Sequence, residues 1–213
     1  MKRCFDILSS LFAVILFLPI GIPIAMVLKF TGEGYVFYRQ QRIGKSGKMF
    51  GLLKFATMLK DSPNMPGAYI TTKTDPRVLP VGRFLRKTKL NEAPQLLNIL
   101  FGDMSVVGPR PQVQKHFDMY PKDIKEQLLN IKPGLTGIGS IIFRDEESLM
   151  EQSKMSKEDF YRQHIAPRKA ELELWYIKNQ SFILDMKLIL LTAWVVLFPN
   201  STLPQRVFKF PTK

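Results

Sequence analysis

Cysteine and histidine are scarce in this chain of 213 residues, which holds one cysteine, Cys4, and two histidines, His116 and His164. One cysteine excludes an internal disulfide framework and is typical of a reducing compartment. Two histidines argue against a zinc site, so any metal is expected to be Mg²⁺ bound by oxygen ligands. The length fits one main domain with attached segments.

Acidic side chains are also few: 18 aspartates and glutamates stand against 31 lysines and arginines, which gives a net charge of +13 and a pI near 9.9. Such a charge predicts an anionic partner: nucleic acid, acidic lipid head groups or a phosphorylated substrate. The sequence has no zinc-finger spacing, helix-turn-helix signature or aromatic RNA-binding motif. Nucleic acid is therefore not expected as a partner.

Charge is missing altogether from residues 7–28, a run of 22 residues. A straight helix of this length would reach about 33 Å, enough to cross the hydrocarbon core of a bilayer. A full membrane span, a cleaved signal peptide and a buried core helix are alternative interpretations. The signal peptide is disfavoured because the run is long and no Ala-x-Ala-like cleavage site follows it.

Two features of this run favour a bent helix over a straight span. Pro19 and Pro23 lie near its middle, where proline removes backbone hydrogen bonds and kinks a helix. Basic residues flank both ends, with Lys2 and Arg3 before the run and Lys29 after it, which predicts that both ends lie on the cytoplasmic side. We therefore expect a re-entrant helix that enters one leaflet of the membrane and returns.

The first half of the remaining chain gives clear local signals. Short aromatic and aliphatic runs at residues 35–38 and 49–55 are joined by a glycine-containing turn at residues 44–47, which predicts a β-hairpin. Apolar residues at helical spacing predict three helices, at residues 79–86, 93–101 and 121–131.

The second half is less regular. Residues 133–139 are interpreted as a tight glycine-rich turn, and residues 140–143 as a short strand. Residues 143–158 are rich in charge and are expected to be exposed. Residues 181–198 form a second apolar segment, but Asp185 and Lys187 make it a poor membrane span. It is expected either to lie flat on the membrane or to pack on the domain.

Asn91 and Glu92 stand just before Ala93 and Pro94, and proline is tolerated in the first turn of a helix. Both residues are therefore expected at a helix N-terminus, where the helix dipole and free N–H groups stabilise negative charge. A carboxylate there would be ionised and well placed beside a metal–phosphate group. The alternative is purely structural, because asparagine is a favoured N-cap and glutamate is favoured in the first turn.

Three arginines indicate a phosphate site. Arg83 and Arg86 lie about one helical turn apart, and Arg110 lies between Pro109 and Pro111. The two prolines restrict the backbone, so this loop should be stiff. A guanidinium held in this way can bind a phosphate through two hydrogen bonds with little entropy left to lose. Taken singly, each arginine could equally be a solvated surface residue.

Several motifs are shared with one family. The most specific are Gly-Asp-Met-Ser at residues 102–105 and Gly-Pro-Arg-Pro at residues 108–111, and further matching stretches lie at residues 2–6, 36–42 and 132–137. In these motifs the chain resembles the monotopic phosphoglycosyl transferases, bacterial sugar transferases that move a sugar phosphate from a nucleotide sugar onto polyprenol phosphate. The resemblance covers nearly the whole chain except residues 143–165 and the extreme tail.

The resemblance also implies roles for single residues. Glu92 matches the second carboxylate of the family's catalytic pair, whereas Asn91 stands where the family has its aspartate nucleophile. The expected phosphate- and substrate-binding residues in the matching stretches are Arg83, Arg86, Arg110 and Lys54. Arg144 lies outside the resemblance and is added because its charged stretch follows the glycine-rich turn and could approach the nucleotide or sugar, although this stretch could equally be a solvated acidic run. The expected metal ligands are Asn91, Glu92 and Glu173, the last of which stands where the family often has an aspartate near the site.

Asn91 leaves the mechanism open, because an amide is a poor oxygen nucleophile. Glu92 could take the place of the nucleophile, or polyprenol phosphate could attack the sugar-bearing phosphate directly. The chain could also be a catalytically silent membrane protein that binds nucleotide sugars or acts as a scaffold. Asn91 could, finally, be an engineered replacement of a natural aspartate.

Together, the patterns and the resemblance predict an α+β, mainly helical fold. Its expected parts are a re-entrant membrane helix at residues 1–30, a catalytic domain at 31–180, an amphipathic interfacial helix at 181–198 and a loose tail at 199–213. The expected place is the cytoplasmic membrane, in a monotopic arrangement with the catalytic domain on the cytoplasmic side. The expected partners are a UDP-sugar, undecaprenyl phosphate and anionic lipids, and the expected cofactor is Mg²⁺. The oligomeric state is left open, with a homodimer as one alternative.

Overall fold

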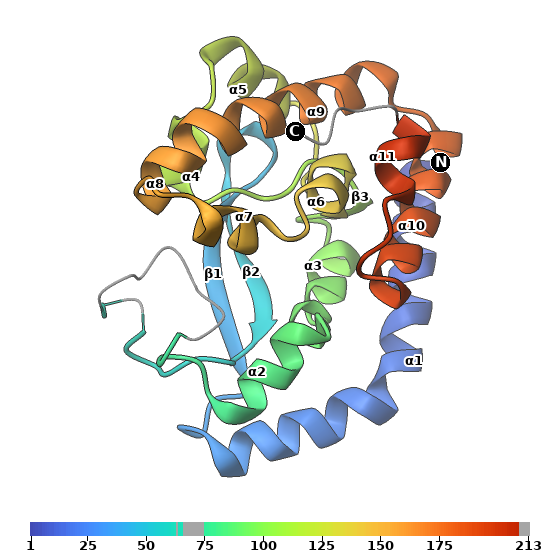
Figure 1. Ribbon diagram of the computed structural model, residues 1–213. Helices are drawn as coiled ribbons and strands as arrows, with labels where there is room; N and C mark the ends of the chain where they lie inside the picture. Colours follow the sequence, from blue (N-terminus) through green and yellow to red (C-terminus); the bar gives the residue numbers. More distant parts are fainter. Residues whose placement is uncertain (63, 66–74, 209–213) are drawn as a thin grey trace. The chain divides into compact units, whose positions relative to one another are not determined.

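A computed structural model of the chain describes residues 1–62, 64–65 and 75–208 (Figure 1). By its internal contacts the chain divides into two compact units. The first unit comprises Met1, Arg3–Arg42 and Phe50–Gly102, and the second comprises Lys2, Ile43–Met49 and Asp103–Lys213. The described part of the chain is mainly helical, as the sequence predicts, and its short strands form two separate pairs.

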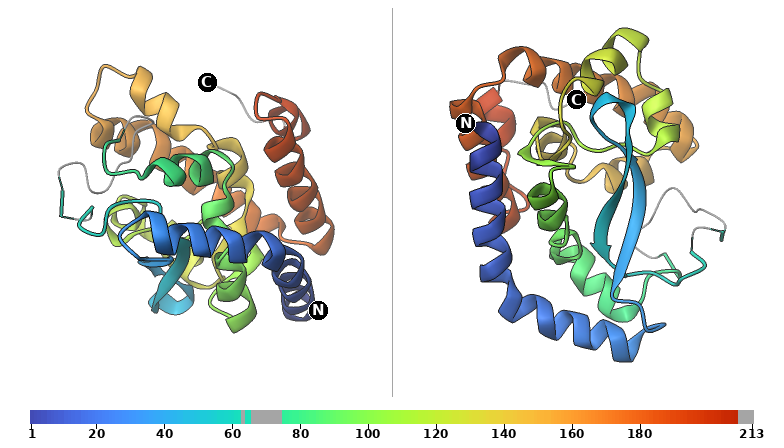
Figure 2. Two further views of the ribbon diagram at one scale, coloured as in Figure 1. Left: turned by 90° about the horizontal axis from the view of Figure 1, so that it is seen from below. Right: turned by 180° about the vertical axis from the view of Figure 1, so that it is seen from behind.

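The apolar run at the N-terminus is one helix, α1 (Lys2–Thr31), with Pro19 and Pro23 inside it. The helix is bent part-way along its length, as Figures 1 and 2 both show. It has the length and composition needed to cross a membrane. Many of its large apolar side chains are exposed, among them Leu8, Phe12, Ile15, Leu16, Ile20, Ile22, Met26 and Phe30. The helix and its bend agree with the sequence prediction, and its membrane arrangement stays a prediction.

The predicted hairpin is present as β1 (Phe37–Ile43) and β2 (Met49–Phe55), which pair with each other. The turn between them contains a short 3₁₀ segment, η1 (Lys45–Gly47), in which Ser46 and Gly47 both have positive φ angles. The first strand begins later and runs further than predicted. Its second half, residues 39–42, is polar, so the hydrophobic pattern gave no signal for it.

The first unit is completed by α2 (Pro80–Lys87), a 3₁₀ turn, η2 (Leu90–Glu92), and α3 (Gln95–Phe101). The side chains of Leu28, Phe55 and Leu85 form a buried cluster, with Leu90 packed against it. This cluster joins α1, β2 and α2. Gly82 brings α2 so close to the backbone of Thr57 that a Cβ at this position would clash with the Thr57 carbonyl.

The second unit contains two short parallel strands, β3 (Ser105–Val107) and β4 (Gly134–Thr136), separated by α4 (Gln114–Asp118) and α5 (Lys122–Leu129). The helix predicted at residues 121–131 is thus confirmed as α5. Residues 133–139 are not a turn, because three of them form β4. Gly108 and Gly134 approach so closely that a Cβ on either one would clash with the opposite backbone. The glycines therefore serve close strand pairing and not a reversal of the chain.

The strand predicted at residues 140–143 is also wrong, because α6 (Ile138–Ile142) occupies this stretch. Ile138 and Ile141 are both buried, three residues apart, which is the spacing of a helix face. A short apolar run does not distinguish a strand from a buried helix by pattern alone.

Four further helical segments follow: α7 (Glu146–Gln152), α8 (Lys157–Phe160), the π-helical η3 (Tyr161–Ile165) and α9 (Ala166–Asn179). The charged stretch at 143–158 is only partly exposed, because Ser148 and Met150 are buried. Its charge pattern suggested a solvated run, whereas these two side chains of α7 face the protein interior.

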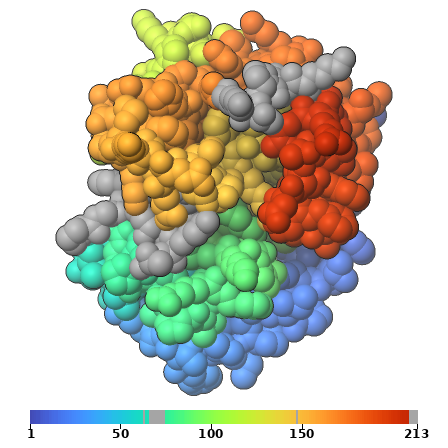
Figure 3. All heavy atoms as spheres, viewed as in Figure 1, coloured from blue at the N-terminus to red at the C-terminus, as the bar shows by residue number. Residues whose placement is uncertain are grey.

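The core of the second unit is built around α9 and α10 (Phe182–Leu197). Five residues of α10 are buried: Leu184, Asp185, Leu188, Leu191 and Val195. One face of α10 therefore packs on the domain, while Ile183, Leu190 and Leu197 of the same helix are exposed, and its contact with the membrane stays a prediction. Residues 203–208, predicted to be loose, form α11 (Leu203–Phe208), which lies on the surface seen in Figure 3, and the end of the predicted tail, 209–213, lies outside the described residues.

Candidate active site

Asn91 and Glu92 lie in the 3₁₀ turn η2 and not at the start of α3. The turn follows Lys89, whose φ of 62° places it in the left-handed region. The N–H of Glu92 donates to the carbonyl oxygen of Lys89 at 3.1 Å, so the turn is fixed by its own backbone. The N-cap of α3 is Pro94, and no side chain caps that helix. The interpretation of Asn91 as an N-cap of the following helix is therefore wrong.

The Asn91 side chain is buried, with 7% of the residue's surface exposed. Its amide oxygen, Oδ1, has no hydrogen-bond partner among the described residues. A buried acceptor without a partner costs about 1–3 kcal/mol, so such atoms are rare unless a ligand or ion completes them. The Asn91 side chain thus holds a buried oxygen that is able to accept from a ligand or bind an ion.

The turn is positioned by helices on either side. Arg83 is exposed on α2, and Arg86 on the same helix is half-buried, with its Nη1 3.9 Å from the Met58 sulfur. On α3, the Asn98 side chain donates to the Gly51 carbonyl and accepts from the N–H of Leu53, both at 2.9 Å. Asn98 therefore fixes the helix after the turn to strand β2.

Asn98 is a positioning residue that the sequence argument missed. A signal for it is present in the sequence, because an asparagine one helical turn from the apolar positions of this helix is expected to be buried and must then satisfy its amide inside the protein. The next residue of β2 after Leu53 is Lys54, whose ammonium donates to Gln40 Oε1 on β1 at 3.3 Å. Arg42 donates to the same oxygen at 2.7 Å, so two cations converge on one neutral amide.

In the second unit, the backbone of the Arg110 loop is held by hydrogen bonds. The N–H of Gly108 donates to the Thr136 carbonyl at 2.9 Å, and the Pro109 carbonyl accepts from the N–H of Gly134 at 2.8 Å. Pro109 and Pro111 are both buried, and Arg110 between them is half-buried. The loop thus continues the pairing of β3 with β4 and presents one guanidinium.

Glu173, on α9, contacts the backbone of this loop. Its Oε1 accepts a hydrogen bond of 3.2 Å from the backbone N–H of Arg110, and its Oε2 is buried without a partner in the described chain. Burial raises the pKa of Glu173 to about 7, although the Arg110 N–H bond and the charge of Lys169 act in the opposite direction. Gly139 leaves room for this carboxylate, since a Cβ there would clash with Oε1.

A second buried charge pair lies in the same unit. The ammonium of Lys169 forms an ion pair with Glu146 and lies 5.7 Å from the ring centre of Phe143. Burial lowers the pKa of Lys169, and the Glu146 carboxylate opposes this shift. Arg144, expected to bind substrate, is half-buried, and its Nη1 has no hydrogen-bond partner in the part of the chain that the structure describes.

The predicted site residues therefore fall into two sets. Lys54, Arg83, Arg86, Asn91 and Glu92 belong to the first unit, and Arg110, Arg144 and Glu173 belong to the second. Within the first unit, η2 is in contact with α2, which brings the amide–carboxylate pair beside the helix of Arg83 and Arg86.

A magnesium ion was expected on Asn91, Glu92 and Glu173. The unpartnered Asn91 Oδ1 next to Glu92 in the chain fits such an ion, because Mg²⁺ takes oxygen ligands and often only one or two from protein. Glu173 fits it less well, since Oε1 is already bound to the Arg110 N–H and burial favours the neutral acid. Across residues 1–62, 64–65 and 75–208, no three acidic, histidine or cysteine side chains are grouped as a metal site.

Lys2 and Arg3, expected to flank the membrane, both have partners inside the protein. Arg3 donates to the carbonyl oxygens of Ile99 and Leu100 at 2.6 and 2.8 Å. These two residues lie in the last turn of α3, where carbonyl oxygens point out of the helix end and a cation is favourable, and the Ile99 carbonyl also accepts from the N–H of the C-cap residue Gly102 at 3.1 Å. Lys2 forms an ion pair with Asp185.

Comparison with known proteins gives the following matches. A family model described as bacterial sugar transferase matches residues 1–199. The chain is 40% identical over 196 residues to a UDP-glucose:undecaprenyl-phosphate glucose-1-phosphate transferase of Klebsiella pneumoniae, which covers 91% of this chain and 39% of that protein. It is 35% identical over 205 residues to the exopolysaccharide production protein ExoY of Sinorhizobium fredii, covering 90% of this chain and 83% of that protein.

A third relative is the undecaprenyl-phosphate galactose phosphotransferase of Salmonella typhimurium, 33% identical over 211 residues. The match covers 92% of this chain and 40% of that protein. The chain thus spans about two fifths of the length of two of these relatives and most of the length of the third.

Proposed function

Because the chain belongs to the bacterial sugar transferase family, we propose that it transfers a sugar phosphate from a UDP-sugar to undecaprenyl phosphate. The products are a polyprenyl-diphospho-sugar and UMP, and the step begins the assembly of a surface glycan such as an exopolysaccharide. The observation that carries this proposal is the match over nine tenths of the chain to relatives named for this transfer. The Arg110 loop supports it, because it is built to hold one guanidinium in place for a phosphate.

In the covalent route, a carboxylate oxygen of Glu92 attacks the sugar-bearing phosphorus of the UDP-sugar. The bond from that phosphorus to the UMP oxygen breaks, and UMP leaves. An oxygen of undecaprenyl phosphate then attacks the same phosphorus and displaces the Glu92 carboxylate. In this route, Asn91 at the preceding position of the same turn would orient Glu92.

In the direct route, undecaprenyl phosphate attacks in line and Glu92 remains a ligand. Phosphoryl transfer depends mainly on positioning and charge stabilisation, so a fixed arginine and a metal–carboxylate site are sufficient in principle. Bound Mg²⁺, held by Asn91 Oδ1 and Glu92, would neutralise charge on the diphosphate. Arg86 and Arg110 would bind phosphate oxygens, and Lys54 and Arg144 would contact the rest of the nucleotide sugar.

We further propose that the protein acts at the cytoplasmic face of the bacterial membrane, with α1 as a re-entrant helix. The exposed apolar side chains along the bent α1 support this placement, because they would otherwise face water. The net charge of +13 supports contact with anionic lipids on the same side.

The test is turnover of a panel of UDP-sugars with undecaprenyl phosphate, measured as UMP release. We expect release with at least one sugar, and Glu92→Gln should reduce the rate by two or more orders of magnitude. Release of UMP without the lipid, with a labelled adduct on Glu92, would support the covalent route, and strict dependence on both substrates would favour direct transfer. Full activity of Glu92→Gln would exclude both roles of Glu92.

A silent nucleotide-sugar-binding protein is the second candidate, favoured by the amide at position 91. It predicts binding of UDP-sugar without turnover. Turnover that appears only in Asn91→Asp would support this candidate, whereas turnover by the chain as it stands would exclude it.

A further inference from the structure

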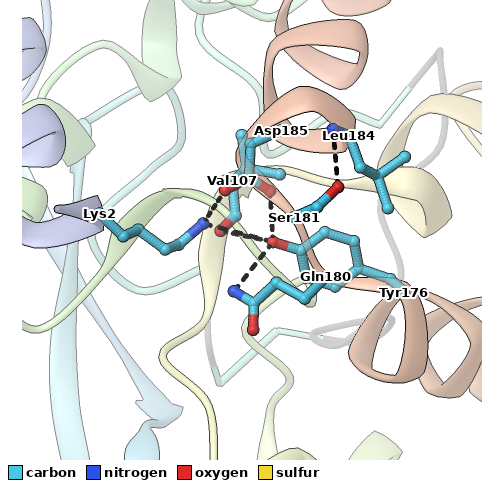
Figure 4. A network of polar contacts seen from close by, with 7 residues as sticks. All are labelled: Lys2, Val107, Tyr176, Gln180, Ser181, Leu184 and Asp185. Carbon is cyan, nitrogen blue, oxygen red and sulfur yellow. Dashed lines mark hydrogen bonds and ion pairs between the residues drawn. The ribbon is translucent and has the colours of Figure 1, made fainter.

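Asp185 is a buried carboxylate that the proposed reaction does not use. It lies in the first turn of α10, which begins after the N-cap Ser181, and only 6% of its side chain is exposed. A carboxylate in such a place is costly unless it is paired and hydrogen-bonded. Its Oδ2 is paired with the ammonium of Lys2, and its Oδ1 accepts a hydrogen bond of 2.7 Å from the Tyr176 hydroxyl (Figure 4).

Tyr176 is the centre of this network. Its ring is fully buried on α9, and its hydroxyl oxygen is 3.3 Å from the ammonium of Lys2 and 3.4 Å from the amide nitrogen of Gln180. Burial, and after it the Asp185 carboxylate, raise the pKa of Tyr176 far above that of an ordinary phenol. The group therefore stays a hydrogen-bond donor at every physiological pH.

The same hydroxyl reaches strand β3. It lies 3.3 Å from the carbonyl oxygen of Val107, the last residue of that strand. The chain then runs directly into Gly108, Pro109 and Arg110, which are held by the pairing with β4. Lys2, Asp185 and Tyr176 thus form a continuous polar contact to the strand that carries the Arg110 loop, and Figure 4 shows these side chains converging beside Val107.

We propose that Lys2 is a positioning residue for the Arg110 loop, acting through Asp185 and Tyr176. When the ammonium of Lys2 neutralises Asp185, the carboxylate keeps the Tyr176 hydroxyl in place beside the end of β3. The ion pair of Lys2 with Asp185 and the position of Arg110 are then coupled, so that loss of the ion pair displaces the loop. The catalytic consequence rests on the proposed function, whereas the structural coupling does not.

The experiment compares Lys2→Met with Lys29→Met in the full-length protein in detergent. Both substitutions remove one positive charge from the same helix, but Lys29 donates to the Gly34 carbonyl at an exposed site. The first readout is hydrogen exchange of the amides at residues 105–110, because the N–H groups of Gly108 and Arg110 are hydrogen-bonded in the native protein. We expect about 5- to 10-fold faster exchange there in Lys2→Met and no change in Lys29→Met.

The second readout is steady-state kinetics with the active UDP-sugar. We expect Lys2→Met to raise KM for the UDP-sugar by about 5- to 10-fold, with a smaller change in kcat, because the arginine that binds phosphate is less well held. Lys2→Arg, which keeps the charge, should have the same KM for the UDP-sugar as the wild type. A merely structural role would lower the active fraction and kcat while leaving KM unchanged.

Tyr176→Phe serves as a second variant, since it removes one hydroxyl and leaves the helix intact. It should also accelerate exchange at residues 105–110. Unchanged exchange in both Lys2→Met and Tyr176→Phe would overturn the proposal. If the wild-type chain turned over no UDP-sugar, the proposed function would fail, and the exchange measurement alone would still decide the coupling.

Discussion

Glu173 shows at the level of one residue how burial changes a role suggested by a motif. The sequence offers a carboxylate for a metal, and the structure places that carboxylate against a backbone N–H, with its other oxygen lacking a partner among the described residues. A neutral acid with one accepted hydrogen bond suits this place better than an ion. We therefore expect Glu173 to support the Arg110 loop in its protonated form below about pH 7.

The free energy of unfolding should therefore depend on pH through Glu173. The pKa of Glu173 is raised from 4.5 to about 7, so between these values the folded chain binds more protons than the unfolded chain. The free energy of unfolding should then fall as the pH rises through this window, by on the order of 2 kcal/mol. Thermal unfolding in detergent at pH 5 and pH 8 measures the effect.

Glu173→Gln is the matched control, because its amide oxygen still accepts from the Arg110 N–H and cannot ionise. This variant should show a clearly smaller loss of stability between pH 5 and pH 8 than the wild type. An identical pH dependence of the two proteins would mean that Glu173 ionises in the folded state as easily as in the unfolded chain.

At the scale of elements, one side chain joins helix α3 to strand β2. Replacing Asn98 by alanine removes two hydrogen bonds and leaves the Leu53 N–H and the Gly51 carbonyl without this partner. We expect a loss of about 1–3 kcal/mol in the free energy of unfolding, measured by chemical denaturation. Gln127→Ala, on α5, removes an exposed bond of 3.3 Å within its own helix and should be nearly neutral. Equal effects of the two changes would contradict the role of Asn98.

The helices and strands also show which parts of the fold can be predicted from the spacing of apolar residues. The helices near residues 79–86 and 121–131 were found because their apolar stripes repeat at helical spacing over two or more turns. α6 was missed because five residues are too short for a period, and β4 because glycine is a turn former in isolation. Gly134 is needed because the backbone of Gly108 lies against it. Gly108 is distant in the sequence, so the residues around Gly134 alone do not reveal this contact.

The candidate site divides in the same way. The two prolines beside Arg110 predict a stiff loop, and the structure shows the backbone of Gly108, Pro109 and Arg110 held by hydrogen bonds. By contrast, Asn98, Tyr176 and the pair of Lys169 with Glu146 act through partners distant in the chain, so no spacing rule identifies them. The sequence predicts the charged residues of the candidate site, but not the residues whose hydrogen bonds and ion pairs position them.

The bent helix α1 gives a topological prediction. The chain has one cysteine, Cys4, which is exposed near the start of α1, and Thr31 is exposed at its end. In a re-entrant arrangement, Cys4 of the wild type and the introduced thiol of a Cys4→Ser, Thr31→Cys double variant would react with a membrane-impermeant maleimide from the same side. Both should label in inside-out vesicles and not in intact spheroplasts. Labelling from opposite sides would establish a full span.

At the scale of the whole molecule, two forces could hold the protein to a membrane: its net charge of +13 and the apolar surface of α1. Charge attraction is screened by salt, whereas apolar burial is not. We expect the protein to remain in the membrane fraction after a wash with about 1 M salt, where screening is nearly complete, and to be released by detergent. Release by salt alone would mean that charge, and not α1, is the anchor.

The ion pair of Lys2 with Asp185 has a consequence for the order of synthesis. The two residues are 183 positions apart, so the ribosome releases α1 long before the acceptor for its first side chain exists. During that interval the ammonium must be satisfied by water or lipid phosphate, and it exchanges this partner for Asp185 when α10 is made. The position that Lys2 takes in the folded protein is therefore reached only after nearly the whole chain has been made.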